Sequence, residues 1–187
     1  VNNFTSAIYH WTMDDEGSTT TIESIGTLEN DLTIDDGVIT YGTGQYGDSI
    51  VFAEAPALEQ FLELTTDVTN TTRTVTFWVK FHEKATEKGS NQELFDNIYQ
   101  HTANNYIYAT GGSDYFSVPA ITNDSWVFMA YIIEDKTIPA LQQLWVDDTK
   151  YNIILQGLAG DSWDIETIGS SEGGHLHGEI DDFRVYD

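Results

Sequence analysis

Acidic side chains interrupt a strand-like pattern at the carboxyl end of the chain. Asp181 and Asp182 stand side by side in the run Gly178–Tyr186, which otherwise has the composition of a β-strand. A carboxylate on a packed sheet costs free energy unless a cation or hydrogen-bond donors neutralise it. Calcium suits such a position because it is a hard cation that binds oxygen ligands. The pattern therefore predicts a calcium site where this strand meets other acidic loops.

The chain is strongly acidic. Its 187 residues include 31 Asp plus Glu against 7 Lys plus Arg, a formal net charge of -24. A surface of this kind repels phosphate backbones and anionic membranes, so we expect no nucleic-acid partner. Salt or bound divalent cations relieve such self-repulsion, which suits an extracellular or calcium-rich setting. Solubility alone is the other reason that a protein can be this acidic.

Length and hydrophobicity indicate one folded domain. Hydrophobic residues make up 40% of the chain and aromatic residues 13%, which argues against disorder. No apolar run approaches the length needed to cross a bilayer, so we expect no membrane insertion. The chain has no cysteine, which excludes disulfides and thiolate metal sites but leaves the redox compartment open. Because the chain starts at Val1 and stops after a strand, we expect residues 1–187 to be one domain of a longer protein, with neighbouring domains as partners.

Alternating hydrophobicity predicts an all-β fold. The clearest case is Arg73–His82, where Val75, Phe77, Val79 and Phe81 share one face and Thr74, Thr76, Trp78 and Lys80 share the other. The closing strand needs a partner, and Phe4–Met13 is the best candidate. Turn residues separate further strands, which are expected at Leu32–Ile34, Val38–Tyr41, Ser49–Ala53, Phe61–Leu64, Glu93–Phe95, Tyr106–Ala109, Tyr115–Val118, Trp126–Glu134, Gln142–Val146, Tyr151–Leu155 and Trp163–Ile168. This spacing is typical of a two-sheet antiparallel sandwich or jelly roll.

Several short motifs occur in a familiar order. They are Tyr9–Asp14, Gly44–Phe52, Val75–Lys80, Asp124–Ala130, Leu144–Asp147 and the closing strand. Together they resemble the concanavalin A-like lectin/glucanase fold in its laminin-G-like branch, over almost the whole chain. The resemblance implies a two-sheet antiparallel jelly-roll sandwich that often binds calcium and carbohydrate or protein ligands. One departure is Asp148, which stands where the family usually has a glycine.

The resemblance also implies which residues hold the calcium ion. By its spacing to Tyr186, Asp181 matches the aspartate that ligates a structural calcium in this fold. Backbone carbonyls from the first strand and from the Gly44–Gly47 loop, including Gly47, would supply further oxygens, and Asp14 is a plausible side-chain neighbour. The alternative is that Asp181 accepts backbone N–H groups or pairs with Arg184.

The richest mixture of aromatic and polar side chains lies between residues 96 and 114. Sugar sites combine aromatic rings with amide and carboxylate groups. The candidate ligand-binding residues are therefore Asp96, Asn97, Tyr99, His101, Asn105, Tyr106, Tyr108 and Asp114. The alternative is that about half of these rings belong to the core. A second cation could bind Asp96, Asn97 and Asp114, although ordinary polar turns are the favoured interpretation.

Two other patterns carry less weight. His175 and His177 are two residues apart, as in some zinc sites, but no cysteine or third histidine supports a metal there. Glucanases of the resembled fold carry Glu-x-Asp-x-x-Glu on one strand face. Glu179 and Asp181 match its first two positions, whereas Arg184 occupies the third. The sequence therefore favours a binding module over a glycoside hydrolase.

These observations predict a calcium-stabilised extracellular module on a secreted, cell-surface or virion-surface protein. Its expected partner is a glycan or a cell-surface glycoprotein, bound as part of an adhesin or a multidomain secreted protein. The alternative is a structural or protein-binding module of a viral fibre or surface filament that binds no sugar. Exposed aromatic side chains in a groove would favour the first interpretation.

Overall fold

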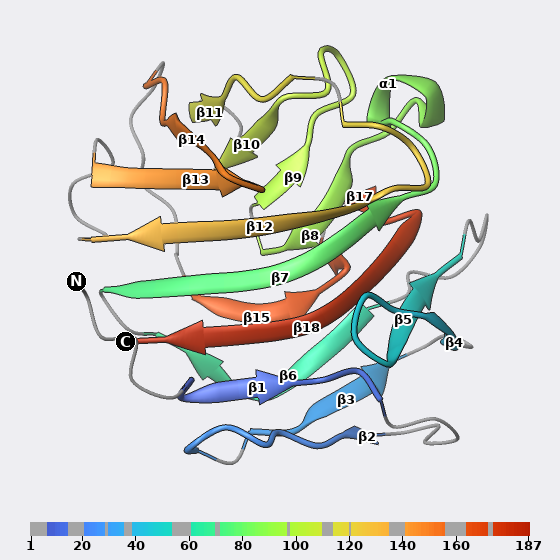
Figure 1. Cartoon of the computed structure of the whole chain (residues 1–187), viewed down its shortest axis with the longest axis vertical. Coiled ribbons are helices and arrows are strands. Elements are labelled where there is room, and N and C mark those ends of the chain that lie inside the picture. Colours follow the sequence, from blue (N-terminus) through green and yellow to red (C-terminus); the bar gives the residue numbers. More distant parts are fainter. Residues whose placement is uncertain are drawn as a thin grey trace.

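The computed structural model is a sandwich of two antiparallel sheets (Figure 1). It describes residues 7–14, 21–28, 30–35, 39–53, 61–69, 72–96, 98–109, 114–119, 121–134, 141–155, 164–171 and 174–187. Sheet A consists of β1 (Tyr9–Trp11), β4 (Thr40–Thr43), β5 (Asp48–Phe52), β7 (Arg73–Phe81), β12 (Trp126–Ile133), β13 (Gln142–Val146), β14 (Thr149–Asn152) and β18 (Gly178–Tyr186). Their order is β14-β13-β12-β7-β18-β5-β4, with β1 also paired to β18.

Sheet B covers the other side of the core. It consists of β2 (Thr21–Ile22), β3 (Leu32–Asp35), β6 (Phe61–Val68), β8 (Gln92–Phe95), β9 (Ile98–Gln100), β10 (Ile107–Ala109), β11 (Asp114–Phe116) and β15 (Ile165–Ile168), in the order β11-β10-β9-β8-β15-β6-β3-β2. A small two-stranded sheet joins β16 (Ser170–Ser171) to β17 (Gly174–His175), and α1 (Ala85–Lys88) follows β7. Among the residues described, no helix is long and apolar enough to cross a membrane.

The core forms where the inner faces of the two sheets meet. Alternate residues of β7 are buried along its whole length, as its period-two pattern predicts. Phe77 of β7 stacks on Phe183 of β18, with ring centroids 5.4 Å apart. Phe95 of sheet B packs edge-on against both of these rings, at 5.7 and 5.6 Å. These aromatic contacts join the two sheets, and they leave the other face of β7 free to form a surface.

The closing strand β18 lies in the middle of sheet A. It pairs with β7 along its length, with β5 through Gly178–Ile180 and with β1 near its end. The prediction that the opening and closing segments pair is confirmed, since Tyr9 lies opposite Val185 and Trp11 opposite Phe183. Residues 4–6 of the predicted opening strand lie outside the described residues.

A β-bulge sets the directions of the two adjacent carboxylates of β18. Asp181 lies opposite Trp78 and Arg184 opposite Thr76. The two residues between them on β18, Asp182 and Phe183, therefore face one residue of β7, Phe77. The bulged residue Asp182 has a φ of 51°. Both carboxylates lie in the middle of β18, next to the bulge. The extra residue lets Asp182 point to the outer surface while Phe183 still reaches the core.

Local elements differ from the sequence expectations at a few places. The hairpin after β13 turns over Asp147 and Asp148 alone, because Val146 already pairs with Thr149. The segment between the strands expected at Arg73–His82 and Glu93–Phe95 contains α1, which ends at Gly89 in the left-handed region (φ 80°).

Candidate functional site

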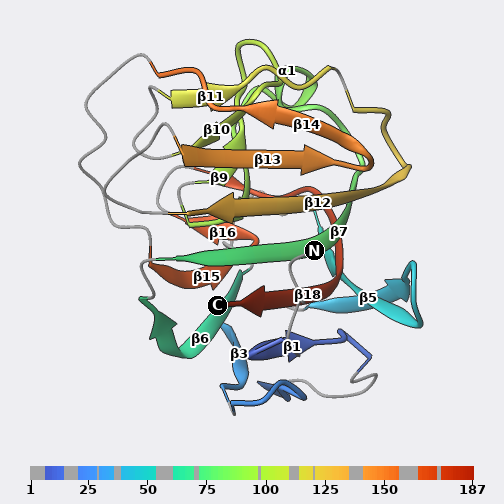
Figure 2. The ribbon, with the colours of Figure 1, turned by 60° about the vertical axis from the view of Figure 1, so that its left-hand side comes forward.

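A groove crosses the outer face of sheet A over four neighbouring strands. In the order β13-β12-β7-β18, these strands lie side by side (Figure 2). The register aligns Trp145, Ala130, Thr76 and Arg184 in one row across the sheet. In this row the two central strands carry the short side chains of Ala130 and Thr76. The flanking strands carry the long side chains of Trp145 and Arg184. The difference in side-chain length hollows the face between β13 and β18.

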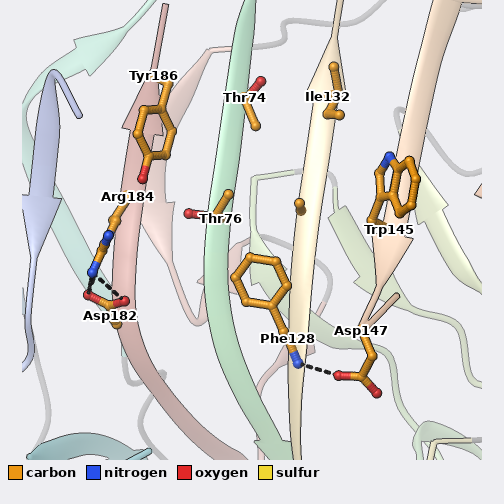
Figure 3. A pocket seen from close by; sticks show the side chains of 10 residues that line it. Thr74, Thr76, Phe128, Ile132, Trp145, Asp147, Asp182, Arg184 and Tyr186 are labelled. Atoms are coloured by element: carbon orange, nitrogen blue, oxygen red, sulfur yellow. Dashed lines mark hydrogen bonds and ion pairs between the residues drawn. The ribbon is translucent and has the colours of Figure 1, made fainter. Parts of the chain in front are cut away.

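Figure 3 shows the resulting pocket, which we call the sheet A groove. Its cavity volume is ≈ 470 Å³. Trp145 stands on one side, Tyr186 stands on the other, and both side chains are partly exposed. Three strand spacings of about 4.8 Å separate their strands, so the walls are roughly 14 Å apart. The residues that line the groove are Thr74, Thr76, Phe128, Ala130, Ile132, Trp145, Asp147, Asp182, Arg184 and Tyr186.

The groove continues toward the Gly44–Gly47 loop. A second hollow shares Phe128, Asp147, Asp182 and Arg184 with the first and adds Tyr46 and Trp78. The Trp78 ring contacts Phe128, with centroids 5.3 Å apart, and the Tyr46 ring meets Trp78 edge-on at 6.0 Å. Aromatic side chains from five segments of the chain therefore line a continuous surface. Tyr46, which is 59% exposed, is the most accessible of them.

The polar groups of the groove are fixed by hydrogen bonds. Arg184 donates from Nε and Nη2 to Oδ1 of Asp182, at 3.0 and 2.9 Å, and His10 lies 2.6 Å from the same oxygen. Burial alone would raise the pKa of Asp182, but the bonds to His10 and Arg184 outweigh it and hold the pKa below its usual value. At the opposite wall, Oδ1 of Asp147 accepts the backbone N–H of Phe128 at 3.0 Å. These groups are held in place before any ligand arrives.

Beyond the groove, the outer face of sheet A carries a buried cluster of Glu179, Lys80 and Ser49. Glu179 is 6% exposed, lies 2.6 Å from Lys80 Nζ and accepts the Ser49 hydroxyl at 2.7 Å. Glu179 and Asp181, the two carboxylates that match the hydrolase pattern, are both absent from the groove lining. Each is engaged by neighbouring residues of the protein, so the groove does not present them to a substrate as an acid and base pair.

The predicted metal residues come together at one end of the groove. Asp181 is fully buried, and its Oδ2 accepts the backbone N–H of Tyr46 at 2.8 Å. A side chain at Gly44 would come within 2.6 Å of the same oxygen, so the loop needs glycine there to approach Asp181. Burial raises the pKa of Asp181 to about 6, with smaller contributions from the charges of Asp182 and Asp14.

Asp14 holds the other end of the same loop. Its Oδ1 accepts the backbone N–H of Asp48 at 2.7 Å. Gly47 has a φ of 79°, and a Cβ on it would lie 2.1 Å from this oxygen of Asp14. Both predicted carboxylates thus accept hydrogen bonds from the Gly44–Gly47 loop or the residue that follows it. Within the loop, Gly44 N–H donates to the Gly47 carbonyl at 2.9 Å.

The donor set of this loop fits calcium better than a transition metal. Oδ1 of Asp181 is buried and has no hydrogen-bond partner among the described residues. An oxygen in that position is costly unless something else satisfies it, and a hard cation would do so. The described part of the chain contains no group of three or more His, Cys, Asp or Glu side chains that could hold a metal. A cation here would therefore depend on two carboxylates and backbone carbonyls.

The predicted ligand region becomes a stack of rings on sheet B. Tyr108 stacks on His101 at 4.4 Å, on Tyr115 at 5.2 Å and on Tyr99 at 5.7 Å, and Tyr106 stacks on Tyr115 at 5.3 Å. The rings are nearly parallel, so each ring covers part of a neighbour's face. Sugars stack on exposed ring faces, which makes this cluster a poorer platform than the groove.

The polar residues of the same region have mostly structural contacts. Asp96 accepts the backbone N–H of Thr167 at 2.9 Å and its hydroxyl at 3.1 Å, and it also accepts the N–H of Glu166. Asp114 is 1% exposed. Asn105 accepts the Thr86 N–H and donates to the Thr86 hydroxyl. Asn97 lies outside the described residues. The structure thus gathers the predicted rings but separates the carboxylates from them.

The histidine pair adopts a different arrangement from the one considered for zinc. His175 belongs to β17, whereas His177 lies just before β18. The Nδ1 atom of His177 is 2.9 Å from Glu83, and its ring packs edge-on against His82 at 5.3 Å. The two residues do not share one strand face.

Sequence reasoning missed the groove as a site. The alternation of β7 correctly placed Thr76 and Trp78 on the outer face, but Trp145 and Tyr186 are far apart in the sequence. Only the strand order, which puts β13 and β18 on either side of β12 and β7, joins them. The available signal was the presence of aromatic residues at outer-face positions of strands whose inner faces are already apolar.

Comparison with known structures supports the fold. No protein-family model matches the sequence, and no curated protein matches it. Domain 4 of AbnA, a GH43 extracellular arabinanase from Geobacillus stearothermophilus solved in complex with arabinotriose, has a TM-score of 0.62 at 14% identity, covering 97% of this chain and 92% of that one. The shared feature is the β-sandwich.

Two bacterial toxin domains are also similar. The binding domain of botulinum neurotoxin serotype D has a TM-score of 0.58 at 11% identity, and the receptor binding domain of the mosaic serotype C/D toxin has 0.60 at 11%. Each match covers 97% of this chain but 48% and 47% of the toxin chains, so the present chain spans about half their length. At these identities the likeness shows the fold alone.

Proposed function

We propose that the chain is a non-catalytic binding module that holds a carbohydrate in the sheet A groove. The observation that carries the proposal is the placement of the Trp145 and Tyr186 rings on either side of a floor that contains Thr74, Thr76, Phe128, Ala130 and Ile132. Aromatic faces stack on the C–H faces of sugars, and fixed polar groups orient the hydroxyls. Arg184, Asp182 and Asp147 supply both donors and acceptors for such hydroxyls at the rim.

The charge of the groove favours a neutral glycan. Among the described residues that line the groove, Arg184 is the one with a cationic side chain, and its guanidinium is already paired with Asp182. Asp147 adds a further negative charge, and the whole chain carries a net charge of -24. A sulfated or phosphorylated ligand would meet repulsion here, whereas a neutral saccharide would not.

The similar structures point in the same direction. One was solved in complex with arabinotriose and belongs to an extracellular enzyme, and the others are binding domains of toxins. These relationships support an extracellular module with a glycan or a cell-surface glycoprotein as its partner. We propose that the domain belongs to the laminin-G-like branch of the concanavalin A-like fold, and its two-sheet antiparallel sandwich supports this proposal. Glu179 and Asp181 lie outside the groove lining, which supports binding without hydrolysis.

We further propose that calcium binds beside the groove. Asp181, Asp14 and carbonyl groups of the Gly44–Gly47 loop, including Gly47, would hold it. The unpartnered Oδ1 of Asp181 and the raised pKa of its carboxyl support a cation at this position. A bound calcium ion would supply positive charge that offsets the buried carboxylate and stiffens the loop.

A glycan array with the purified chain tests the function, with calcium and with chelator. We expect binding to neutral oligosaccharides, weakened at least tenfold by Trp145→Ala. Tyr106→Ala removes a ring from the stack on the opposite sheet and is the matched control, which should bind as the unmodified chain does. A flat array at high protein concentration would reject the carbohydrate proposal and favour a structural or protein-binding module. Loss of binding in Tyr106→Ala alone would move the site to the tyrosine stack.

A further inference from the structure

Tyr46 belongs to two sites at once. Its side chain lines the end of the sheet A groove, where the ring lies edge-on against Trp78 with centroids 6.0 Å apart. Its backbone N–H donates to Oδ2 of Asp181 at 2.8 Å. One residue therefore connects the proposed ligand surface to the proposed cation loop, without any intervening element.

The ring of Tyr46 has little else to hold it. It is 59% exposed, and Trp78 is the one ring that it contacts among the described residues. Its position must then follow from the backbone of the Gly44–Gly47 loop. Because the four-residue loop sets the position of the Tyr46 side chain at the rim of the groove, the side chain moves when the loop moves.

The loop itself is held by the two carboxylates that would bind the cation. Asp181 bonds to Tyr46 N–H, Asp14 bonds to Asp48 N–H, and Gly44 N–H closes the turn on the Gly47 carbonyl. Oδ1 of Asp181 is buried and has no hydrogen-bond partner among the described residues, so it is available to a cation. A cation shared by Asp181 and Asp14 would satisfy this oxygen and draw both ends of the loop together.

From this arrangement we propose that Tyr46 is a positioning and specificity residue of the groove, and that the cation at Asp181 and Asp14 sets its place beside Trp78. The inference rests on the proposed function, because it assigns a regulator to the same groove. Cation and saccharide then bind with positive linkage. By thermodynamic reciprocity, calcium tightens saccharide binding by the same factor by which the saccharide tightens calcium binding.

The first test needs no saccharide. Calcium chloride is titrated into the chain while tryptophan fluorescence is recorded, because Trp78 reports on the approach of Tyr46. We expect a saturable change that is lost in Trp78→Phe and strongly reduced in Tyr46→Ala but kept in Trp145→Phe. Calorimetry with calcium alone should show that Tyr46→Ala still binds the ion, since its backbone N–H remains. Calcium binding without any change in the Trp78 signal would overturn the proposal, and so would the absence of calcium binding.

The second test measures the linkage directly. Affinity for the strongest array ligand, or for arabinotriose as the starting probe, is measured in calcium and in chelator. We expect at least a fivefold tighter binding with calcium in the unmodified chain, and no dependence on calcium in Tyr46→Ala. Tyr46→Gln serves as a second variant, and circular dichroism checks the fold of both. Equal affinity in calcium and chelator would refute the linkage and leave the groove assignment standing, whereas failure of every saccharide would refute the function and leave the fluorescence result to decide the role of Tyr46.

Discussion

Asp181→Asn separates the charge of this residue from its hydrogen bond. The amide has nearly the shape of the carboxylate, and its oxygen can still accept the N–H of Tyr46. What disappears is a negative charge on a fully buried side chain. The variant therefore asks whether that charge is a cost that a cation removes, or only part of the structure of the loop.

The size of the effect follows from the pKa of Asp181. Burial, together with the charges of Asp182 and Asp14, raises it from 3.8 to about 6. A shift of about two units corresponds to roughly 3 kcal/mol against the charged form in the folded state. For a domain of this size, 1 kcal/mol changes Tm by about 2–4 °C. In chelator at pH 7.5, Asp181→Asn should then raise Tm by up to roughly 6–12 °C.

The pH dependence has a definite sign. Because the folded-state pKa is raised, the folded chain holds this proton more tightly than the unfolded chain does. The cost is fully present above pH 6 and disappears as the pH falls toward 3.8. The Tm difference between Asp181→Asn and the unmodified chain should therefore shrink between pH 7 and pH 4 in chelator.

Calcium should reverse the order of the two proteins. Thermal melts followed by circular dichroism, in chelator and in millimolar calcium chloride, make the comparison. We expect calcium to raise Tm of the unmodified chain and to leave Asp181→Asn nearly unchanged, so that the unmodified chain becomes the more stable one. An equal loss of Tm in Asp181→Asn under both conditions would refute the reasoning, because it would mean that the carboxylate serves only as a hydrogen-bond acceptor.

Three further substitutions test neighbouring parts of the account. Gly47→Ala places a Cβ against Oδ1 of Asp14 at a φ of 79°, so we expect a lower Tm and at least tenfold weaker calcium binding by calorimetry. Phe183→Ala opens a cavity between the sheets and should lower the free energy of unfolding by about 3–5 kcal/mol in urea melts, and a loss below 1 kcal/mol would contradict the packing described. Asp96→Ala frees the backbone N–H of Thr167 and should cost about 1–3 kcal/mol of stability while leaving saccharide affinity unchanged, and lost affinity in a folded variant would return Asp96 to the ligand site.

Much of the fold follows from local pattern. The alternation of β7 predicted its buried and exposed faces correctly, because every second residue of a strand points the same way. The pairing of the first and last strands was also predicted, and Tyr9 opposite Val185 confirms it. The bulge at Asp182 could not be predicted, because one inserted residue cannot be recognised in the short hydrophobic pattern of the closing strand. It nevertheless decides that Asp181 meets the loop while Asp182 meets Arg184.

The site was harder to predict than the fold. Asp181, Asp14 and Gly47 were predicted to share one place, and the structure brings them to the same loop. The calcium ion itself stays a prediction. The groove depends on strand order, since Trp145 and Tyr186 become neighbours only after β12 and β7 are placed between them.

In the predicted ligand region, local composition could not predict the orientation of the aromatic rings. A dense set of aromatic residues in one short segment does not tell whether the rings face solvent or one another. On sheet B the Tyr108 ring lies against Tyr115 and His101, so most of its surface is already covered. Ring orientation, which decides whether a sugar can stack, is a property of the folded sheet.

The central claim, that the sheet A groove binds the carbohydrate, is tested most directly by calorimetry. The strongest array ligand is titrated into the unmodified chain and into Trp145→Ala and Tyr186→Ala. The account predicts that each substitution weakens binding at least tenfold, while Tyr106→Ala, on the opposite sheet, keeps the affinity of the unmodified chain. Unchanged affinity in both groove variants would contradict the assignment of the sheet A groove as the carbohydrate site.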